Sequence, residues 1–522
     1  MKMKNIIALT LAILMLAACV IGCGTPTDGP SSEVEFNVGS LPIVNEPVTL
    51  KVLCQDTSDK QYSLAKDAGY WKWLSEKTGI TFEIESYSKE ELANKLPLIM
   101  ADPTQMPDLF IACNLTETSV VNYAEGGQLL KLNDLIDQYG TNIKKMFAEN
   151  PTALGASVLA DGSIYAMPAM NGSPAYVMYA VNERFLKNSG INEFPTTLEE
   201  LAADLKVMRE KDANGNGIVG DEILWSCEPK QFKRQALSMV GISCYWPWQG
   251  VIVDDRDGEV FFVPTSEEYK YLLTVLRDLW NAGCIDSEIF TQDYAQHVAK
   301  FDKDLVFMGE YTDDPESANY KGMSGWTYMD PVTSAVHDEP IYVVGSDYQV
   351  AIGAVSAFTK YPEICALVLD YMYSYDASLT SKWGIEGVDF TVVKEDPWTI
   401  KSISPDIPLG YAYTPYLAPR LTTADMIQPQ DTVLKQTRVD KRDKYGDFGW
   451  QNYLHLTTDQ ADTLGVLSTD LGLFCDDYWA GFITGTYSIE EDWDEYVAEC
   501  NKMKANEIVA VYQDAYDVFF GK

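Results

Sequence analysis

Basic residues are in short supply in this chain, which has 39 Lys and Arg residues against 77 Asp and Glu residues. The formal net charge is therefore −38 at pH 7. A surface this acidic repels phosphate backbones and anionic lipid headgroups, so we expect binding neither to nucleic acid nor directly to headgroups. A strongly anionic ligand would need a local group of basic residues.

Histidine is scarce as well, and the familiar catalytic motifs are absent. Only His297, His337 and His455 occur, and the chain has no H-E-x-x-H or G-x-S-x-G sequence. We therefore predict no catalytic residue and a protein that is not an enzyme. A glycan hydrolase remains the alternative, because 77 carboxylates supply many acid pairs, although acids in this number mostly form a solvated surface.

The ten cysteines include no C-x-x-C pair, which excludes a zinc ribbon and the usual redox motif. Eight of them lie beyond the N-terminal segment, mostly in apolar surroundings. A chain of this length can form a stable core without disulfide bonds. Buried free thiols are therefore favoured over a disulfide framework. These eight are Cys54, Cys113, Cys227, Cys244, Cys284, Cys365, Cys475 and Cys500.

The N-terminal segment has the layout of a signal peptide over residues 1–22. Lys2 and Lys4 precede an uncharged apolar run from Ile6 to Ile21. This run is shorter than the roughly 18 residues that a membrane-spanning helix needs. We therefore expect the segment to be removed, and the rest of the chain to act on the extracytoplasmic face of the cell membrane.

A cysteine at the end of this segment predicts a lipid anchor. Val20-Ile21-Gly22-Cys23 resembles the lipobox of bacterial lipoproteins, whose cysteine is diacylated and becomes the new N-terminus. Cys19, after Leu16-Ala17-Ala18, fits nearly as well. We prefer Cys23 because residues 23–45 then form a tether that begins with flexible polar residues, whereas cleavage before Cys19 leaves two apolar residues outside the membrane.

Strand and helix patterns alternate along the next part of the chain. Val48 to Leu53 and Ile80 to Ile84 alternate like strands, whereas Tyr62 to Lys77 and Lys89 to Ala101 have helical spacing. This order is typical of an α/β protein with parallel sheets. No Pro- and Gly-rich linker divides the chain after residue 45, so two domains would have to be interlaced by short crossings.

The order of several landmarks resembles the family 1 extracellular solute-binding proteins, and in particular the larger lipoproteins of carbohydrate ABC importers. The resemblance implies a two-lobed periplasmic-binding-protein-like fold of type II, with hinge-linked doubly wound lobes, a ligand between them and no catalysis. It covers most of residues 48–522. The landmarks are Thr78-Gly79-Ile80, Met106-Pro107-Asp108, Asp161-Gly162-Ser163-Ile164-Tyr165, Val181-Asn182-Glu183-Arg184-Phe185, Phe194-Pro195-Thr196-Thr197-Leu198 and Gly384-Ile385-Glu386-Gly387.

This resemblance sets the expected organisation and partners. We expect the first lobe to hold residues 46–170 and 341–400, and the second lobe residues 171–340 and 401–522. A monomeric receptor would capture a carbohydrate, an oligosaccharide in our expectation, and deliver it to the transmembrane subunits of an ABC importer. A receptor of the same fold for a peptide or another small solute is a further alternative.

The segment from Lys211 to Glu222 has two competing interpretations. Its glycines fit G-x-G-x-x-G, but the pattern follows a helix and its acids would repel a pyrophosphate, so we reject a nucleotide site. The oxygens of Asp212, Asn214 and Asn216 instead occupy positions 1, 3 and 5 of a calcium loop, and the Ile218 carbonyl occupies position 7.

The calcium pattern is incomplete at its end. Position 12 is Ile223, so Asp221 and Glu222 would have to complete the shell. The loop resembles the calcium loop of some oligosaccharide-binding lipoproteins, with Gly220 as an apparent insertion. We predict a structural Ca²⁺ here, with a simple loop of Asx turns as the alternative.

Aromatic residues supply the case for a sugar site. Tyr245-Trp246-Pro247-Trp248 places three rings around a proline without helical spacing, so some rings should line a surface. Sugars stack on aromatic faces and hydrogen-bond to amides and carboxylates. Ligands of α/β sheets bind beyond the carboxyl ends of strands. The predicted binding residues are therefore Asn114, Asn171, Trp246, Trp248, Glu310, Tyr311 and Trp326.

Overall fold

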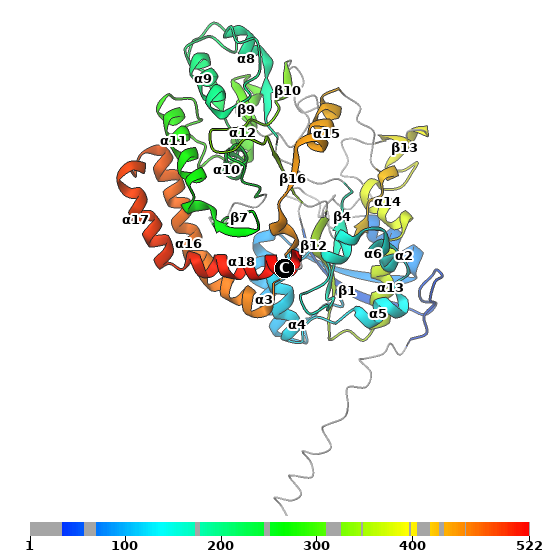
Figure 1. Cartoon of the computed structure of the whole chain (residues 1–522). Coiled ribbons are helices and arrows are strands. Elements are labelled where there is room, and N and C mark those ends of the chain that lie inside the picture. The colour runs from blue at the N-terminus through cyan, green and yellow to red at the C-terminus, as the bar shows by residue number, and fades with distance from the viewer. Residues whose placement is uncertain are drawn as a thin grey trace, which may run out of the picture.

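The chain folds around two main β-sheets with helices packed on them. The computed structural model describes residues 34–56, 69–172, 178–244, 251–309, 325–345, 348–395, 398–403, 418–426, 433–454 and 456–520. The first sheet lies in the lower part of Figure 1 and the second in its upper part. Within these ranges, no helix combines the length and the apolar character that crossing a lipid bilayer requires.

The first sheet has six strands in the order β15-β4-β12-β3-β1-β2. Only β12 runs antiparallel to its neighbours. The central strands β3 and β4 are buried at every position, because helices cover both faces of the sheet. The strands are β1 (Val48–Gln55), β2 (Ile80–Tyr87), β3 (Leu109–Ile111), β4 (Ala166–Met170), β12 (Tyr348–Val355) and β15 (Arg420–Leu421).

We call this sheet and its helices the first lobe. The sequence defines α3 clearly: Ser88 and Glu91 form a reciprocal capping box at its start, and Leu92, Leu96 and Ile99 are its buried stripe. The helix coincides with the predicted range Lys89 to Ala101. The helices are α2 (Gly69–Thr78), α3 (Lys89–Ala101), α4 (Glu117–Glu125), α5 (Asn133–Tyr139), α6 (Thr141–Glu149), α7 (Pro151–Gly155), α13 (Pro362–Met372) and α14 (Tyr375–Trp383).

The second sheet has four strands in the order β10-β5-β9-β6, and only β5 runs antiparallel to its neighbours. We call this sheet and the elements packed on it the second lobe. The strand β5 begins at Ala180, and residues 173–177 before it lie outside the described ranges. The strands are β5 (Ala180–Asn182), β6 (Ile223–Trp225), β9 (Val306–Gly309) and β10 (Trp326–Tyr328).

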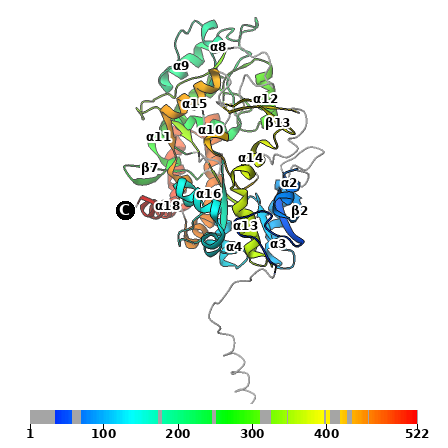
Figure 2. The same ribbon diagram turned by 90° about the vertical axis from the view of Figure 1, so that its right-hand side faces the viewer.

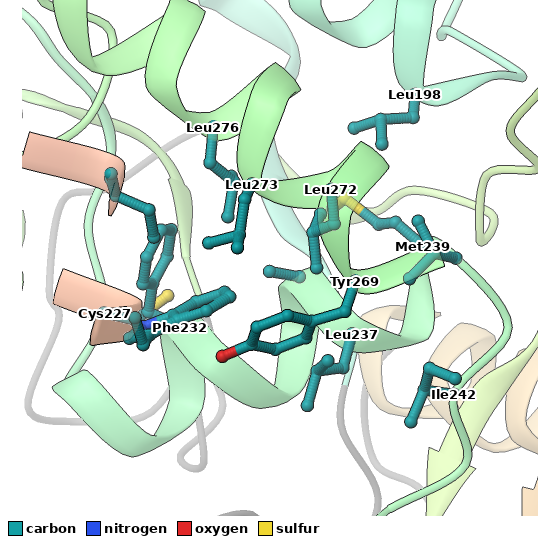
Figure 3. Packing of buried hydrophobic residues seen from close by; sticks show 14 of the residues in the cluster. Leu198, Cys227, Phe232, Leu237, Met239, Ile242, Tyr269, Leu272, Leu273 and Leu276 are labelled. Atoms are coloured by element: carbon teal, nitrogen blue, oxygen red, sulfur yellow. The ribbon is translucent and has the colours of Figure 1, made fainter. Parts of the chain in front are cut away.

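The core of the second lobe is built around the helix α11 (Glu267–Asn281) (Figure 3). Leu272, Leu273 and Leu276 recur on one face of α11 and are fully buried beside Tyr269 and Phe232. Each fully buried leucine contributes about 2 kcal/mol through apolar area removed from water. The other helices of this part are α8 (Glu183–Asn188), α9 (Leu198–Arg209), α10 (Pro229–Ser238) and α12 (Tyr294–Asp302).

Three C-terminal helices pack along the side of the molecule: α16 (Thr458–Thr484), α17 (Ile489–Lys502) and α18 (Ala505–Phe520) (Figure 1). The longest, α16, begins at a capping box between Thr457 and Gln460 and ends at Gly485 in the left-handed conformation. It contacts α11 of the second lobe and α4 of the first lobe, so it connects the two (Figure 2).

Two short parallel strands, β11 (Tyr342–Val344) and β16 (Gly446–Phe448), lie where the chain passes between the lobes. Tyr342 anchors β11 to the second lobe, because its hydroxyl donates to the Met329 carbonyl and its ring lies 5.5 Å from that of Tyr179. The remaining elements are β7 (Val253–Arg256), β8 (Glu259–Phe262), β13 (Phe390–Glu395), β14 (Trp398–Ser402), α15 (Val433–Tyr445), η1 (Val263–Thr265), η3 (Ala424–Met426) and η4 (Trp450–Tyr453).

The expected lobe boundaries can be placed beside these sheets. The strand β12 of the first sheet falls in the predicted return segment 341–400, and α16 to α18 fall in the range predicted for the second lobe. The strand β15 falls in that same range, yet it pairs with β4 of the first sheet. The first sheet therefore extends past residue 400, and the boundaries themselves stay predictions.

Candidate ligand-binding edges and the loop at residues 212–222

Five strands of the first sheet run in the same direction, so their carboxyl ends lie along one edge. We call this the first edge. Asn114 follows β3, Asn171 follows β4 and Thr422 follows β15. The carboxyl ends of parallel strands are the usual place for a ligand in an open α/β sheet. The first edge thus presents two of the predicted binding residues, Asn114 and Asn171.

The turn after β3 holds Asn114 in an unusual backbone conformation. Ala112 and Asn114 have φ values of 53° and 56°, in the left-handed region that asparagine tolerates better than most residues. Cys113 between them is buried, and its thiol donates to the Leu53 carbonyl over 3.1 Å. The buried thiol holds the turn against the sheet and leaves Asn114 exposed to solvent.

Asn171 is half-buried and hydrogen-bonded at the end of β4. Its Oδ1 accepts from Arg420 Nη2 over 2.8 Å. Beside this arginine, burial and the Arg420 charge lower the pKa of Lys382 to about 8. The first edge therefore includes a pair of basic residues in an otherwise acidic chain.

In the second sheet, the carboxyl ends of β6, β9 and β10 lie together with the start of β5. We call this the second edge. The chain approaches itself closely here, because a Cβ added to Gly309 would lie 2.3 Å from the Ser226 carbonyl oxygen. Glycine is therefore required at the end of β9. The predicted residues Glu310 and Tyr311 come next but lie outside the described ranges.

A buried polar network lies at the second edge, and we call its four members the second-edge network: Ser226, Asp286, Gln292 and Lys300. Asp286 Oδ2 accepts from Ser226 Oγ and from Lys300 Nζ, each over 2.6 Å. Gln292 Oε1 accepts from Lys300 Nζ over 2.7 Å, and Gln292 Nε2 donates to the Cys227 carbonyl over 2.5 Å. Asp286 is 5 % exposed, so its ion pair with Lys300 is largely shielded from water.

This network is not an activated nucleophile, although it contains a serine next to an acid and a histidine. His297 Nδ1 lies 3.4 Å from Ser226 Oγ, but the serine contacts Asp286 directly instead of through the imidazole. A catalytic triad needs the histidine between the other two groups. Lys300 also neutralises the acid. The arrangement therefore fits a rigid support for the edge and gives no base for the serine.

Trp326 lies away from the second edge. It opens β10 and pairs with Asn182 at the far end of β5. Its ring is stacked on Phe301, with ring centroids 5.0 Å apart. The ring is thus part of the packing between β10 and α12.

The described members of the predicted set lie at two separate locations. Asn114 and Asn171 share the first edge, Trp326 packs at the opposite end of the second sheet, and Trp246, Trp248, Glu310 and Tyr311 lie outside the described ranges. Sequence reasoning missed the second-edge network. Its members are separated by up to 74 residues, and no local spacing pattern connects Ser226 with its partner 60 positions later.

The loop between α9 and β6 folds as a compact set of side-chain turns. Asp212 Oδ2 accepts from the Gly217 N–H over 2.9 Å, and Asn216 Oδ1 accepts from the Ile218 N–H over 2.8 Å. The side-chain amides of Asn214 and Asn216 donate to the two oxygens of Asp221. Asn214 and Asn216 are thus brought together around the Asp221 carboxylate, and Asp212 is bonded to the backbone of the same loop.

Glu222 has a different position in this loop. It is buried, and its carboxylate accepts from the backbone N–H groups of Ala213, Asn214 and Gly220. Asp212 Oδ1 is a buried oxygen without a hydrogen-bond partner. Carboxylate and amide oxygens are what Ca²⁺ prefers, so the donor set fits the ion. Because no three His, Cys, Asp or Glu side chains gather at one point in the described ranges, amide and carbonyl oxygens would have to complete the shell.

One further buried acid, Asp254, lies beside the 3-10 helix η4, which follows β16 in the chain. Asp254 on β7 accepts from the N–H groups of Ser243 and Asp255, and Gln451 donates to its Oδ1 over 3.4 Å. Burial raises the pKa of Asp254 to about 7 in spite of these hydrogen bonds. The acid is therefore sensitive to pH near neutrality.

These features define a two-lobed α/β protein in which two sheet edges carry polar groups. Residues 56–276 match the family model of the bacterial extracellular solute-binding protein. The chain is 23% identical to the fructooligosaccharide ABC transporter substrate-binding protein FusA of Streptococcus pneumoniae, over 99% of this chain and 98% of that protein. Over residues 56–276 the chain is therefore similar to the bacterial extracellular solute-binding proteins, and along almost its whole length it is similar to one carbohydrate-binding member of that group.

Solved structures show the same fold. The S. pneumoniae FusA complex with kestose has a TM-score of 0.73 and 20% identity, covering 91% of this chain and 99% of that one. An EF-hand mutant of FusA in complex with fructo-nystose also has a TM-score of 0.73, with 21% identity and the same coverage. An extracellular solute-binding protein from Bifidobacterium longum subsp. infantis has a TM-score of 0.78 and 18% identity, covering 91% and 98%.

Proposed function

We propose that this chain is the substrate-binding component of a carbohydrate ABC importer, which captures an oligosaccharide and delivers it to the transmembrane subunits. The observation that carries the proposal is the match to a fructooligosaccharide-binding protein along almost the whole of both chains. A match of this extent includes both lobes and the segments that join them, and is not limited to one shared motif.

The ligand would lie between the two edges. On the first edge, Asn114 and Asn171 would hydrogen-bond to sugar hydroxyls. From the second lobe, Trp246, Trp248 and Tyr311 would stack on sugar faces. Glu310 would accept hydrogen bonds from sugar hydroxyls. Trp326 is left out of this set because its ring packs on Phe301. Arg420 would act through Asn171 by orienting its amide.

The remaining predictions complete the picture of a surface receptor. Cys23 would carry the lipid anchor, and residues 23–45 would tether a monomer to the outer face of the membrane. The chain itself would not enter the bilayer. Delivery would then need only contact with the importer, and no catalysis by this chain.

We also propose that the loop at residues 212–222 holds a structural calcium ion. Asp212, Asn214, Asn216 and Asp221 would supply side-chain oxygens, and Ile218 would supply its carbonyl. Glu222 would hold the loop backbone around the ion through the three N–H groups that it accepts. The ion would neutralise acids that otherwise repel each other, which stabilises the loop.

Calorimetric titration against a panel of glycans and peptides tests the proposed function. The panel would contain fructooligosaccharides, other neutral oligosaccharides, uronic-acid oligosaccharides, monosaccharides and short peptides. We expect one oligosaccharide class to bind, and mass spectrometry of the mixture to find it unchanged after long incubation. Product formation that disappears when one acid is replaced would support the hydrolase alternative, and binding of peptides alone would support the other receptor.

A further inference from the structure

Two cysteines on different helices bring their sulfur atoms close together in the core of the second lobe. Cys475 lies on α16 and Cys500 on α17, 25 positions apart in sequence. Their Sγ atoms are 3.9 Å apart, and both residues are 0 % exposed. A disulfide needs its sulfurs about 2 Å apart, a change that side-chain rotation supplies when the Cβ atoms already face each other.

The two sulfurs have different surroundings in the folded protein. The hydrogen bond from Cys500 lowers the pKa of Cys475, although burial acts in the opposite direction. Lys233, which is buried and ion-paired with Asp476 next in sequence, adds positive charge nearby. A thiolate is the nucleophile in disulfide formation, and either sulfur can attack first while the C-terminal helices are still assembling.

We propose that Cys475 and Cys500 are the site of a structural disulfide that joins α16 to α17 in the exported protein. The Cys475 thiolate attacks the disulfide of an extracytoplasmic thiol oxidoreductase and forms a mixed disulfide, releasing one thiolate of that enzyme. The Cys500 thiolate then attacks the Cys475 sulfur and releases the second. The chain loses two protons and two electrons, and the disulfide of the oxidoreductase becomes a dithiol.

Burial sets when this bond forms. An oxidant cannot reach two sulfurs that are 0 % exposed in the folded protein. The bond therefore forms while the C-terminal helices are still assembling after export, and it is then protected from reductants. The proposal depends on the extracytoplasmic location of the family and is independent of the ligand.

The chain contains a matched pair for comparison, Cys54 and Cys113 in the first lobe. They are neighbours near the ends of β1 and β3, since the Cys113 thiol donates to the carbonyl of Leu53. Cys54 belongs to the core on one face of the first sheet, whereas Cys113 belongs to the core on the other face. The sheet backbone separates their side chains, so this pair stays reduced under the same conditions.

Peptide mapping of the full chain tests the proposal. Protein exported by its natural host would be denatured in an alkylating reagent without reductant, digested, and analysed by mass spectrometry before and after reduction. We expect a linked peptide pair containing Cys475 and Cys500, lighter by two hydrogen atoms than the sum of its parts, and alkylated Cys54 and Cys113. Reduction under denaturing conditions should release both linked peptides.

Two results would overturn the proposal: complete alkylation of Cys475 and Cys500 without reductant, or linkage of either one to a different cysteine. A stability measurement gives an independent check. Denaturation and refolding in reductant should lower the melting temperature of the wild type by on the order of 3 °C, because the cross-link closes a 25-residue separation in the unfolded chain. The same treatment should leave the C475A/C500A variant unchanged, and an equal fall in both proteins would contradict the cross-link.

Discussion

The two edges differ in how their polar groups are held. On the first edge, Asn114 stands on a strained turn and Asn171 is oriented by one hydrogen bond from Arg420. On the second edge, three buried side chains and the partly buried Lys300 form a connected network around the Asp286 and Lys300 ion pair. Single groups at strand ends can be changed without collapse, whereas a buried network loses several interactions when one member is removed. We therefore expect the first edge to respond to substitution mainly in affinity, and the second-edge network mainly in stability.

The largest effect is expected from Asp286→Asn in the second-edge network. The change leaves the partly buried Lys300 with the exposed Glu288 as its charge partner among the described residues, so unfolding free energy should fall by about 4 kcal/mol. Urea unfolding measures this loss. Glu288→Gln is the matched control, because this carboxylate also pairs with Lys300 but is 57% exposed, and it should cost less than about 1 kcal/mol. Equal losses of unfolding free energy in the two variants would show that the buried Asp286 contributes no more to stability than the exposed Glu288.

The buried acid Asp254 should make the stability of the second lobe depend on pH. Its folded pKa of about 7 exceeds the ordinary value of 3.8, so the folded state keeps a proton that the unfolded state has already released. The stabilisation that comes from keeping this proton on Asp254 is fully present below about pH 3.8, and it is lost as the pH rises to about 7. Unfolding free energy should fall by on the order of 4 kcal/mol across this window.

Asp254→Asn should remove most of this fall, which urea titrations at about pH 5 and about pH 7.5 would measure. Asp370 of the first lobe is the counterpart, since it is buried, accepts from the Ile143 N–H, and has a pKa raised by burial. Asp370→Asn should flatten the profile in the same direction. An unchanged pH profile in both variants would refute the assignment of the slope to these acids.

Removal of calcium should cause the next largest loss of stability. An ion that binds only the folded state stabilises it by about 2.7 kcal/mol when present at a hundredfold excess over its dissociation constant. EDTA should therefore lower the melting temperature, and added calcium should restore it. The Asp212→Asn variant should melt at the lower temperature with or without EDTA, because the buried Asp212 oxygen is removed as a charged ligand. A melting temperature that EDTA leaves unchanged would count against the site.

Loss of a stacking ring is the smallest of these effects on free energy. Trp246→Ala, Trp248→Ala and Tyr311→Ala should each weaken binding of the identified oligosaccharide by about thirtyfold, or on the order of 2 kcal/mol. Trp326→Ala is the control that tests the packing against Phe301, and it should lower stability while affinity stays unchanged. A thirtyfold loss from Trp326→Ala would instead place this ring in the binding site.

Local patterns in the sequence were sufficient for much of the first lobe. The helix α3 is defined by its capping box and its apolar stripe, and β1 and β2 by their alternation, all within a few residues. Asn114 was predicted because it follows a short apolar strand, and Asn171 because it stands beside the proposed crossing between the lobes. Each of these predictions depends on neighbours in sequence, and the structure places all of these elements on or beside the first sheet.

The rest depends on contacts between distant parts of the chain. The helix α16 was not predicted, because Thr, Asp and Gly recur inside it and each lowers helix propensity. Packing against α11, α18 and α4 stabilises it instead. The second-edge network was missed for the same reason, since Ser226 meets Asp286 only after the sheet has formed. The burial predicted for the eight cysteines is confirmed, whereas the proximity of Cys475 to Cys500 required the fold.

The central claim is that one ligand is held between both edges, and calorimetric titration of three proteins tests it most directly. The wild type, Asn171→Ala from the first edge and Tyr311→Ala from the second lobe would be titrated with the oligosaccharide that the panel identifies. We predict that each substitution weakens binding by tenfold or more, roughly 1.4 kcal/mol, while the melting temperature without ligand stays close to that of the wild type. Wild-type affinity in either variant would mean that the ligand does not bridge the two edges, and would contradict the account.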